Sequence, residues 1–339
     1  MFGCGGTVLA REEAALFAAI QPAGFILFAR NCETPDQVRA LTAALRDAAG
    51  QPDALVLIDQ EGGRVARLRP PHWRLPPAAG AFGRGWRRDP VRAMAAAEAN
   101  ASLMGLDLIA LGIDVDCAPV LDLGLPETTA AIGDRAFAAD PAIIAALGRA
   151  VVDGLLAAGV LPVIKHIPGH GRARADSHRV LPRVEASAQT LQDSDFLPFR
   201  ALADAPVGMT AHVAYDALDD GVAATLSRCV VNDHIRGAIG FAGLLLSDDI
   251  CMGALVGTHG ERALAALDAG CDLALHCSGV LADMQDVAAT IPPVTPDAVA
   301  RLDAALRRRK AATRPLDRAT LLATMSQAGL SGSGDGKGT

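Results

Sequence analysis

The sequence predicts an α/β protein built as a single (β/α)8 TIM-type barrel. Short apolar segments alternate with longer segments rich in alanine, arginine and leucine along most of the chain. The apolar segments carry few polar residues, as expected for parallel strands whose sheet is covered by helices. Repeated strand–helix alternation fits a closed barrel, and a doubly wound sheet is the alternative.

Each expected strand is a short apolar run, and each expected helix is a longer amphipathic run that follows it. The candidate strands span residues 24–29, 54–59, 115–120, 161–166, 207–212, 243–248 and 273–277. The candidate helices span residues 34–49, 90–107, 140–158, 187–204, 230–239 and 259–269. An eighth strand is not evident, so we expect one strand to be short or irregular. The barrel is expected to form one domain over residues 1–328, followed by a disordered Gly- and Ser-rich tail at 329–339.

Polar side chains stand at the carboxyl ends of several predicted strands, and this favours the barrel. They are Asp59 after Val-Leu-Ile, Lys165 and His166 after Val-Ile, His212 after Met-Thr-Ala, and Asp248 and Asp249 after Leu-Leu-Leu-Ser. Barrel enzymes build their active sites at this face, from the ends of several strands. The pattern therefore predicts an enzyme.

The most informative segment runs from Lys165 to Gly171 and continues at Asp176-Ser177-His178. Lys and Arg together number 31, yet the chain has only three lysines, and Lys165 is the one that directly follows a buried apolar run. A buried ammonium is costly unless it has a polar partner or a ligand. In a chain that otherwise uses arginine, this position favours a compact point charge over a planar guanidinium.

Composition limits the classes of partner and compartment. The 339 residues are 51% hydrophobic and carry a formal net charge of −7, which argues against nucleic acid or an anionic membrane as a partner. The seven cysteines are scattered without a CxxC pair, which indicates free thiols in a reducing compartment. No signal-peptide pattern and no membrane-spanning pattern are recognisable. We therefore predict a cytoplasmic location.

Two motifs have both a chemical and a structural interpretation. In Asp176-Ser177-His178, the aspartate can accept a hydrogen bond from the imidazole and fix its tautomer, which produces an acid/base near neutral pH. A solvated loop histidine is an equally good interpretation. Of Asp248 and Asp249, which face opposite ways at a strand end, one can act as a nucleophile while the other is structural. The structural interpretation is an aspartate that caps the following helix, a role that suits Asp249.

Metal and nucleotide sites are not predicted, and no cofactor is expected. His166 and His170 are four residues apart, but Pro168 and Gly169 disfavour the helix that would bring them together. The turn at residues 59–65 contains two glycines, which allow close backbone approach to a ligand, but it matches no nucleotide-binding pattern. Gly133-Asp134-Arg135 is a further candidate ligand-binding loop.

Taken together, these motifs resemble glycoside hydrolase family 3, and within it the bacterial cytoplasmic β-N-acetylglucosaminidases of cell-wall recycling. The resemblance rests on residues 24–31, 58–65, 118–122, 132–135, 165–171, 176–178, 209–212 and 241–252, which follow the family's order. Ile167 stands where the family usually has phenylalanine, and Ile250-Cys251 stands where it usually has Leu-Ser. Neither departure changes a residue that is expected to do chemistry.

The resemblance implies a retaining mechanism. Asp248 would attack the anomeric carbon and form a covalent intermediate, and His178 would serve as acid and then as base while Asp176 orients it. The resemblance also implies that Asp59, Arg67, Arg135, Lys165 and His166 hold the hydroxyl groups of the terminal sugar. Most retaining glycosidases use a second carboxylate instead of a histidine.

The expected activity is that of a β-N-acetylhexosaminidase which releases terminal β-1,4-linked N-acetylglucosamine from peptidoglycan fragments. The expected substrate is N-acetylglucosaminyl-1,6-anhydro-N-acetylmuramic acid, with or without its peptide, acted on by a monomer. One alternative is a phosphorylase that uses the same site but transfers the sugar to phosphate instead of water. A neutral histidine, unlike a carboxylate, would not repel the incoming phosphate dianion. Another alternative is a non-catalytic barrel that binds cell-wall sugars.

Overall fold

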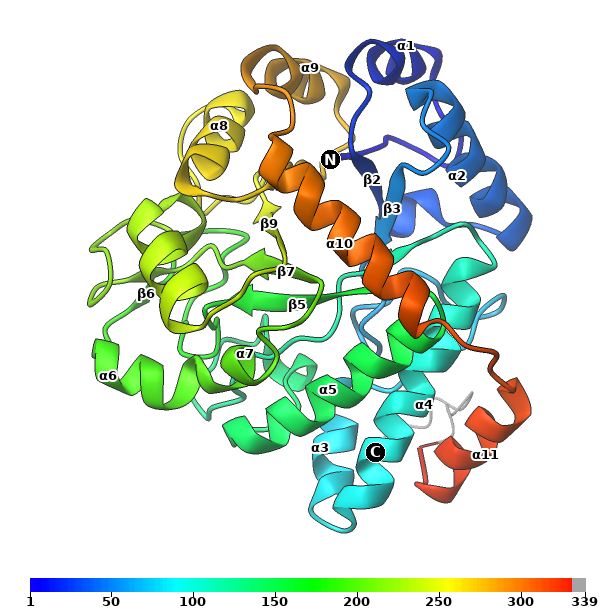
Figure 1. Ribbon diagram of the computed structural model, residues 1–339, viewed down its shortest axis with the longest axis vertical. Coiled ribbons are helices and arrows are strands. Elements are labelled where there is room, and N and C mark those ends of the chain that lie inside the picture. Colours follow the sequence, from blue (N-terminus) through cyan, green and yellow to red (C-terminus); the bar gives the residue numbers. More distant parts are fainter. Residues whose placement is uncertain (331–339) are drawn as a thin grey trace.

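Eight parallel strands form one sheet in the computed structural model, which describes residues 1–330 (Figure 1). Their order in the sheet is β1-β2-β3-β4-β5-β7-β9-β10. The strands are β1 (Phe2–Gly3), β2 (Gly24–Leu27), β3 (Leu55–Ile58), β4 (Val115–Asp116), β5 (Leu161–Ile167), β7 (Val207–Thr210), β9 (Leu244–Asp249) and β10 (Leu273–Leu275). A separate two-stranded parallel ribbon pairs β6 (Arg183–Val184) with β8 (Ala214–Tyr215).

The sheet closes on itself at the seam between its first and last strands. Phe2 forms a parallel bridge with His276, and the Gly3 N–H donates to the His276 carbonyl at 2.7 Å. The His276 N–H in turn donates to the Met1 carbonyl at 3.0 Å. Closure confirms the predicted barrel over a doubly wound sheet. The strand that the sequence did not reveal is β1, because two residues are too few to produce a recognisable pattern.

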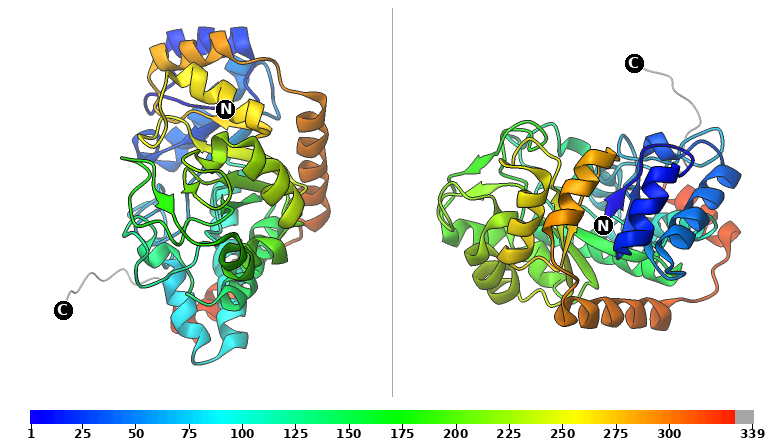
Figure 2. Two further views of the ribbon diagram at one scale, coloured as in Figure 1. Left: turned by 90° about the vertical axis from the view of Figure 1, so that its left-hand side faces the viewer. Right: turned by 90° about the horizontal axis from the view of Figure 1, so that it is seen from above.

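Helices surround the barrel and account for the amphipathic segments (Figures 1 and 2). The α-helices are α1 (Arg11–Ile20), α2 (Pro35–Ala49), α3 (Ala79–Trp86), α4 (Pro90–Ile109), α5 (Pro141–Ala157), α6 (Ala188–Thr190), α7 (Leu197–Ala201), α8 (His259–Ala269), α9 (Leu281–Thr290), α10 (Pro296–Ala312) and α11 (Arg318–Gln327). Segments 191–195 and 230–238 are π-helical. The helix expected at 187–204 is therefore divided into three pieces.

Helix starts follow local capping chemistry. The Thr34 hydroxyl accepts from the N–H of Gln37, and Pro35 occupies the first turn, where its missing N–H costs nothing. Thr258 and Glu261 form a reciprocal capping box at the start of α8. Gly50 and Gly270 end α2 and α8 in the left-handed conformation that glycine adopts without strain.

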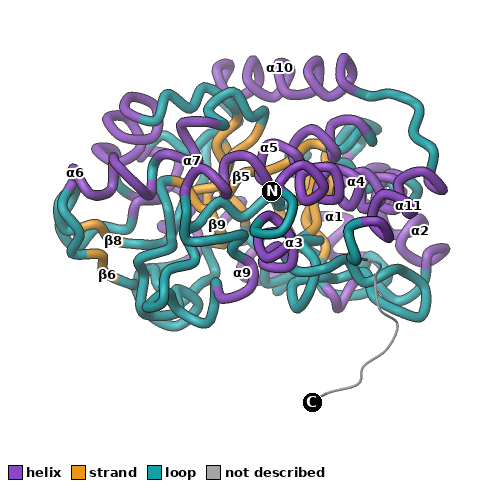
Figure 3. Tube along the Cα trace, turned by 90° about the horizontal axis from the view of Figure 1, so that it is seen from below, coloured by secondary structure: helices purple, strands orange, loops and turns teal. Residues whose placement is uncertain are grey.

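The end of the barrel from which the strands start is covered by α10, which lies opposite the loop-rich end (Figure 3). Two of its arginines pair with aspartates that directly precede strands: Arg309 with Asp114 at 3.3 Å, and Arg301 with Asp272 at 2.6 Å. Asp114 and Asp272 also accept backbone N–H groups of strands β3 and β9. These ion pairs fix α10 against the starts of the strands.

Within residues 1–330, no helix is both long and apolar enough to cross a bilayer. The tail expected to be disordered at 329–339 lies, from residue 331 onward, outside the described residues.

Candidate active site

A cavity of about 300 Å³ opens at the carboxyl ends of the barrel strands. All eight residues that the sequence singled out line it: Asp59, Arg67, Arg135, Lys165, His166, Asp176, His178 and Asp248. They come from the ends of β3, β5 and β9 and from the loops that follow β3, β4 and β5. The fold thus brings together residues that are up to 189 positions apart, the separation of Asp59 from Asp248 (248 − 59).

One wall of the cavity is a chain of alternating charges centred on Lys165. Its ammonium lies 2.8 Å from Asp59 Oδ1 and 2.7 Å from Glu61 Oε1. Arg67 donates to the other Asp59 oxygen at 2.9 Å, and Arg135 binds both Glu61 oxygens at 2.8 Å. The charges therefore alternate in sign along this chain of contacts, so that each buried charge has an opposite neighbour. The order is Arg67–Asp59–Lys165–Glu61–Arg135.

The network keeps its members ionised. Burial alone would raise the pKa of Glu61, but Lys165 and Arg135 more than offset this and lower it to about 2. Burial would also raise the pKa of Asp59, but Lys165 and Arg67 outweigh this effect and hold the pKa well below its usual range. Burial would lower the pKa of Lys165, but the two carboxylates raise it above its ordinary value. Only 3% of the Lys165 side chain is exposed, which explains why a compact ammonium suits the position.

His166 is oriented by a carboxylate from the segment that follows β4. Its Nδ1 lies 2.7 Å from Asp122 Oδ2, and Asp122 Oδ1 accepts the backbone N–H of His170 at 2.6 Å. Asp122 is fully buried; burial raises its pKa, but the two neighbouring histidines outweigh that effect and lower it. With Nδ1 committed to Asp122, His166 presents its other ring nitrogen for a ligand in the cavity.

Asp248 and Asp249 have different surroundings. Asp248 lines the cavity, and its Oδ1 accepts the Asp249 N–H at 2.8 Å. Burial raises the pKa of Asp248, but His212 and His166 outweigh it, so the carboxyl is held below its ordinary value. Asp249 Oδ1 instead accepts the N–H groups of Cys251 and Cys277. Asp249 therefore caps a turn rather than the following helix, whose cap is Thr258.

The loop after β5 places the Asp176–His178 pair in the lining of the cavity. His178 Nδ1 lies 2.8 Å from Asp176 Oδ1, which also accepts the His178 N–H at 3.0 Å. The loop is docked by two backbone bonds, from Gly253 to the His178 carbonyl and from Ala254 to the Ser177 carbonyl. A Cβ on Gly253 would lie 2.9 Å from the His178 carbonyl oxygen, so glycine allows this close approach. The His178 side chain is 66% exposed.

Two further histidines near the cavity, His170 and His212, are buried and have structural partners. His170 Nε2 lies 3.1 Å from the Ser177 hydroxyl and helps to hold the loop. His212 Nδ1 lies 2.8 Å from Thr225 Oγ1, and its Nε2 lies 2.9 Å from the Asp249 carbonyl. His166 and His170 pack edge to face with ring centroids 5.8 Å apart, and they form no metal-ligand group among the described residues.

Several residues of the site were not predicted as site residues from the sequence. Glu61 binds both Lys165 and Arg135, and its spacing of two from Asp59 in a strand-end turn is the signal that could have identified it. Asp122 orients His166, and its place after an apolar strand is a similar signal. Phe28 lies beneath the guanidinium of Arg67 at 5.2 Å, and no local pattern marks it.

Comparison with known proteins identifies the family. Residues 6–309 match the glycosyl hydrolase family 3 N terminal domain. A curated β-hexosaminidase of Alkalilimnicola ehrlichii is 43% identical over 282 residues, which is 82% of this chain and 80% of that protein. A second β-hexosaminidase, from Chromobacterium violaceum, is 39% identical over 89% of this chain and 85% of that protein.

Solved structures agree with the sequence relatives. NagZ of Neisseria gonorrhoeae, crystallised with N-trifluoroacetyl-D-glucosamine, superposes with a TM-score of 0.85 at 30% identity, over 98% of this chain and 97% of that chain. A family 3 β-N-acetylglucosaminidase from a Paenibacillus strain gives a TM-score of 0.79 at 28% identity, over all of this chain and 63% of that chain.

The charge network generates a stability prediction. Lys165→Met removes the cation between two buried carboxylates and should lower the free energy of unfolding by about 3–5 kcal/mol. In the native protein, the lowered pKa of Glu61 contributes stability that is complete above about 4.5 and is lost as the pH falls through about 2. Without Lys165 the pKa of Glu61 rises, so this loss should occur at higher pH.

Urea denaturation between pH 2 and 7 measures both effects. Lys310→Met is the matched control, because Lys310 is exposed on α10. Equal stabilities and equal pH profiles for the two variants would contradict a structural role for the network.

Proposed function

The chain belongs to glycosyl hydrolase family 3, and from this membership and the geometry of its cavity we propose that it releases terminal N-acetylglucosamine from peptidoglycan fragments by a retaining mechanism. It is a glycoside hydrolase of the β-N-acetylhexosaminidase class, as its curated relatives are. The proposed substrate is N-acetylglucosaminyl-1,6-anhydro-N-acetylmuramic acid, with or without its peptide. The proposal retains the monomeric state and cytoplasmic location expected from the sequence.

The observation that carries the proposal is the convergence of a sugar-binding wall, a carboxylate and a histidine on one cavity. Sugar hydroxyls both donate and accept hydrogen bonds, so a wall of fixed carboxylates, ammonium and guanidinium groups suits them. Lys165, Arg135, Asp59, Arg67 and His166 supply these groups in the proposal. A structural neighbour binds N-trifluoroacetyl-D-glucosamine, which supports an N-acylated glucosamine as the ligand.

Asp248 is the proposed nucleophile. Its Oδ1 accepts the Asp249 N–H, whereas Oδ2 accepts no hydrogen bond among the described residues and is the oxygen that would attack. Its lowered pKa keeps the carboxylate in the nucleophilic form. In the first step the Oδ2–C1 bond forms as the bond from C1 to the leaving oxygen breaks, which leaves a glycosyl ester on Asp248.

His178 is the proposed acid/base. With Nδ1 oriented by Asp176, its Nε2 would donate a proton to the leaving oxygen in the first step. In the second step Nε2 would take a proton from water, whose oxygen attacks C1 and releases Asp248. The same nitrogen thus starts and ends protonated. Exposure of this side chain allows water to reach it once the first product has left.

The other two histidines are less suited to this role. Proton transfer needs a ring nitrogen within hydrogen-bond reach of the reacting oxygen. His212 is buried, and both of its nitrogens have partners. His170 is also buried: its Nε2 contacts Ser177, and its Nδ1, which has no hydrogen-bond partner among the described residues, is buried away from the cavity surface.

The first prediction of this proposal concerns substrate and acceptor. The full chain should hydrolyse a chromogenic β-N-acetylglucosaminide. The matching β-glucoside should react at least about tenfold more slowly, because contacts to the acetamido group that add about 1.4 kcal/mol in the transition state change the rate tenfold. Added phosphate should leave the rate unchanged and yield no sugar 1-phosphate. Formation of sugar 1-phosphate would favour phosphorolysis, and no turnover of either glycoside would favour a binding barrel.

Replacement of the nucleophile tests the covalent step. Asp248→Ala should lower kcat by about 10³-fold or more while the thermal unfolding temperature stays close to that of the parent. With a slowly hydrolysed fluorinated glycoside, peptide mass spectrometry should find the sugar on Asp248 of the unmodified protein. Labelling at Asp249 would overturn the assignment, and absence of any label would favour assistance by the substrate's own acetamido group.

Replacement of the acid/base should separate the two steps. His178→Ala should lower turnover of the natural disaccharide by about 10²–10⁴-fold, but it should slow the first step less for an aryl glycoside with a good leaving group. The glycosyl-enzyme should then accumulate, because water attack still lacks its base. Asp176→Asn should show the same defect in milder form. Near-parental rates on both substrates in His178→Ala would place the acid/base elsewhere.

A further inference from the structure

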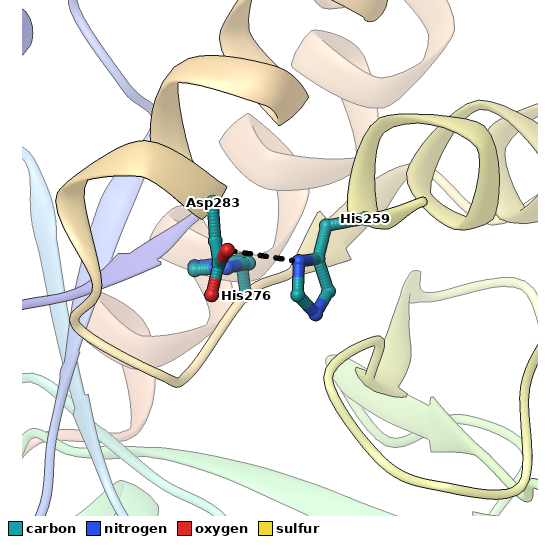
Figure 4. A group of neighbouring side chains, drawn as sticks. All are labelled: His259, His276 and Asp283. Carbon is teal, nitrogen blue, oxygen red and sulfur yellow. Dashed lines mark ion pairs between the residues drawn. The ribbon is translucent and has the colours of Figure 1, made fainter. Parts of the chain in front are cut away.

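His276 lies on the outward-facing side of the strand that closes the barrel. Successive strand residues face opposite sides, and the neighbours Leu275 and Cys277 both line the catalytic cavity. The His276 side chain therefore points away from the cavity, toward the starts of α8 and α9. There it meets His259, the first residue of α8, and Asp283, in the first turn of α9 (Figure 4).

The three side chains converge on one point from three consecutive elements. One potential ligand atom from each lies within 4.8 Å of the others. His259 Nδ1 is 3.4 Å from Asp283 Oδ1, and the two imidazoles pack edge to face with centroids 5.4 Å apart. Tetrahedral zinc with bonds of about 2.0–2.1 Å separates neighbouring ligand atoms by about 3.3–3.4 Å, so the His259–Asp283 spacing already suits zinc.

His276 has unused capacity to bind. Its side chain is only 1% exposed, yet Nδ1 has no hydrogen-bond partner among the described residues. Buried polar atoms are normally paired, so an unpaired imidazole nitrogen calls for an explanation. An imidazole nitrogen that lacks a hydrogen-bond partner is available as a metal ligand.

We propose that His259, His276 and Asp283 bind a zinc ion that clamps α8, β10 and α9 together. Two imidazoles and one carboxylate suit zinc, whereas magnesium and calcium prefer oxygen ligands throughout. Ser278 supports the set, because its hydroxyl lies 3.3 Å from Asp283 Oδ2 and 3.4 Å from His276 Nε2. His259 and Asp283 are partly exposed, so water can complete the coordination shell.

The site is structural and distinct from the proposed catalytic centre. His276 also carries the backbone bonds to Met1 and Gly3 that close the barrel. A zinc ion at this point would join the closing strand to the two helices outside it. Its expected effect is therefore on stability rather than on the hydrolytic step.

The test uses the full chain, freed of metal with a chelator and then titrated with zinc. Zinc at about 100 times its dissociation constant should raise the melting temperature by about 4 °C. His259→Asn and Asp283→Asn should each abolish that rise without changing glycosidase activity in the absence of zinc. His72→Asn, at an exposed histidine outside the site, should keep it.

A second readout separates this site from zinc held by the catalytic loop. Cobalt should give the visible absorption of a four-coordinate ion in the parent and in His178→Ala, and not in His259→Asn. An equal zinc-dependent rise in the parent and in His259→Asn would overturn the proposal, as would a parent that retains no zinc by elemental analysis after gel filtration. Both outcomes are independent of whether the protein hydrolyses β-N-acetylglucosaminides.

Discussion

The burial of one ammonium group, that of Lys165, constrains the whole cavity. Lys165 lies on β5, whereas both of its carboxylate partners follow β3, and β4 runs between these strands. An unpaired charge at this depth would cost several kcal/mol, so the turn at residues 59–63 must bring both carboxylates over β4. Arg67 and Arg135 are then needed as well, because the second oxygen of each carboxylate, Asp59 Oδ2 and Glu61 Oε2, needs a donor. A wall in which every charge has an opposite neighbour follows from this single burial.

The proposed nucleophile and acid/base are held in a different way from the charged wall. Asp248 is held by strand β9 and by its neighbour's N–H, whereas His178 stands on an exposed loop that is docked by two backbone hydrogen bonds. A group that binds sugar hydroxyls benefits from rigidity, because ordering is complete before the ligand arrives. A group that exchanges protons with water must stay accessible. The proposed division of roles between the buried network and the exposed Asp176–His178 pair matches this difference.

Closure of the barrel depends on contacts at both of its ends. At the carboxyl end, His276 joins the last strand to the first, and its side chain forms part of the proposed zinc clamp. At the amino end, Asp114 and Asp272 each pair with an arginine of α10 and also accept a backbone N–H from a neighbouring strand. Charged residues at strand ends therefore connect the helical layer to the sheet, while the apolar strand interiors form the core.

The sequence by itself determined the fold class, most of the strands and eight of the residues that line the cavity. Apolar runs that end in Asp59, Lys165 and Asp248 are local signals, because the carboxyl ends of parallel strands must meet at one face. It did not reveal β1, whose two residues form a strand only through pairing with β2 and through the Phe2–His276 bridge, which joins residues 274 positions apart (276 − 2). Only the tertiary structure decided which charges pair, placed Glu61 between Lys165 and Arg135, and brought His259, His276 and Asp283 together. Such contacts depend on the relative positions of distant elements, and no local pattern specifies those positions.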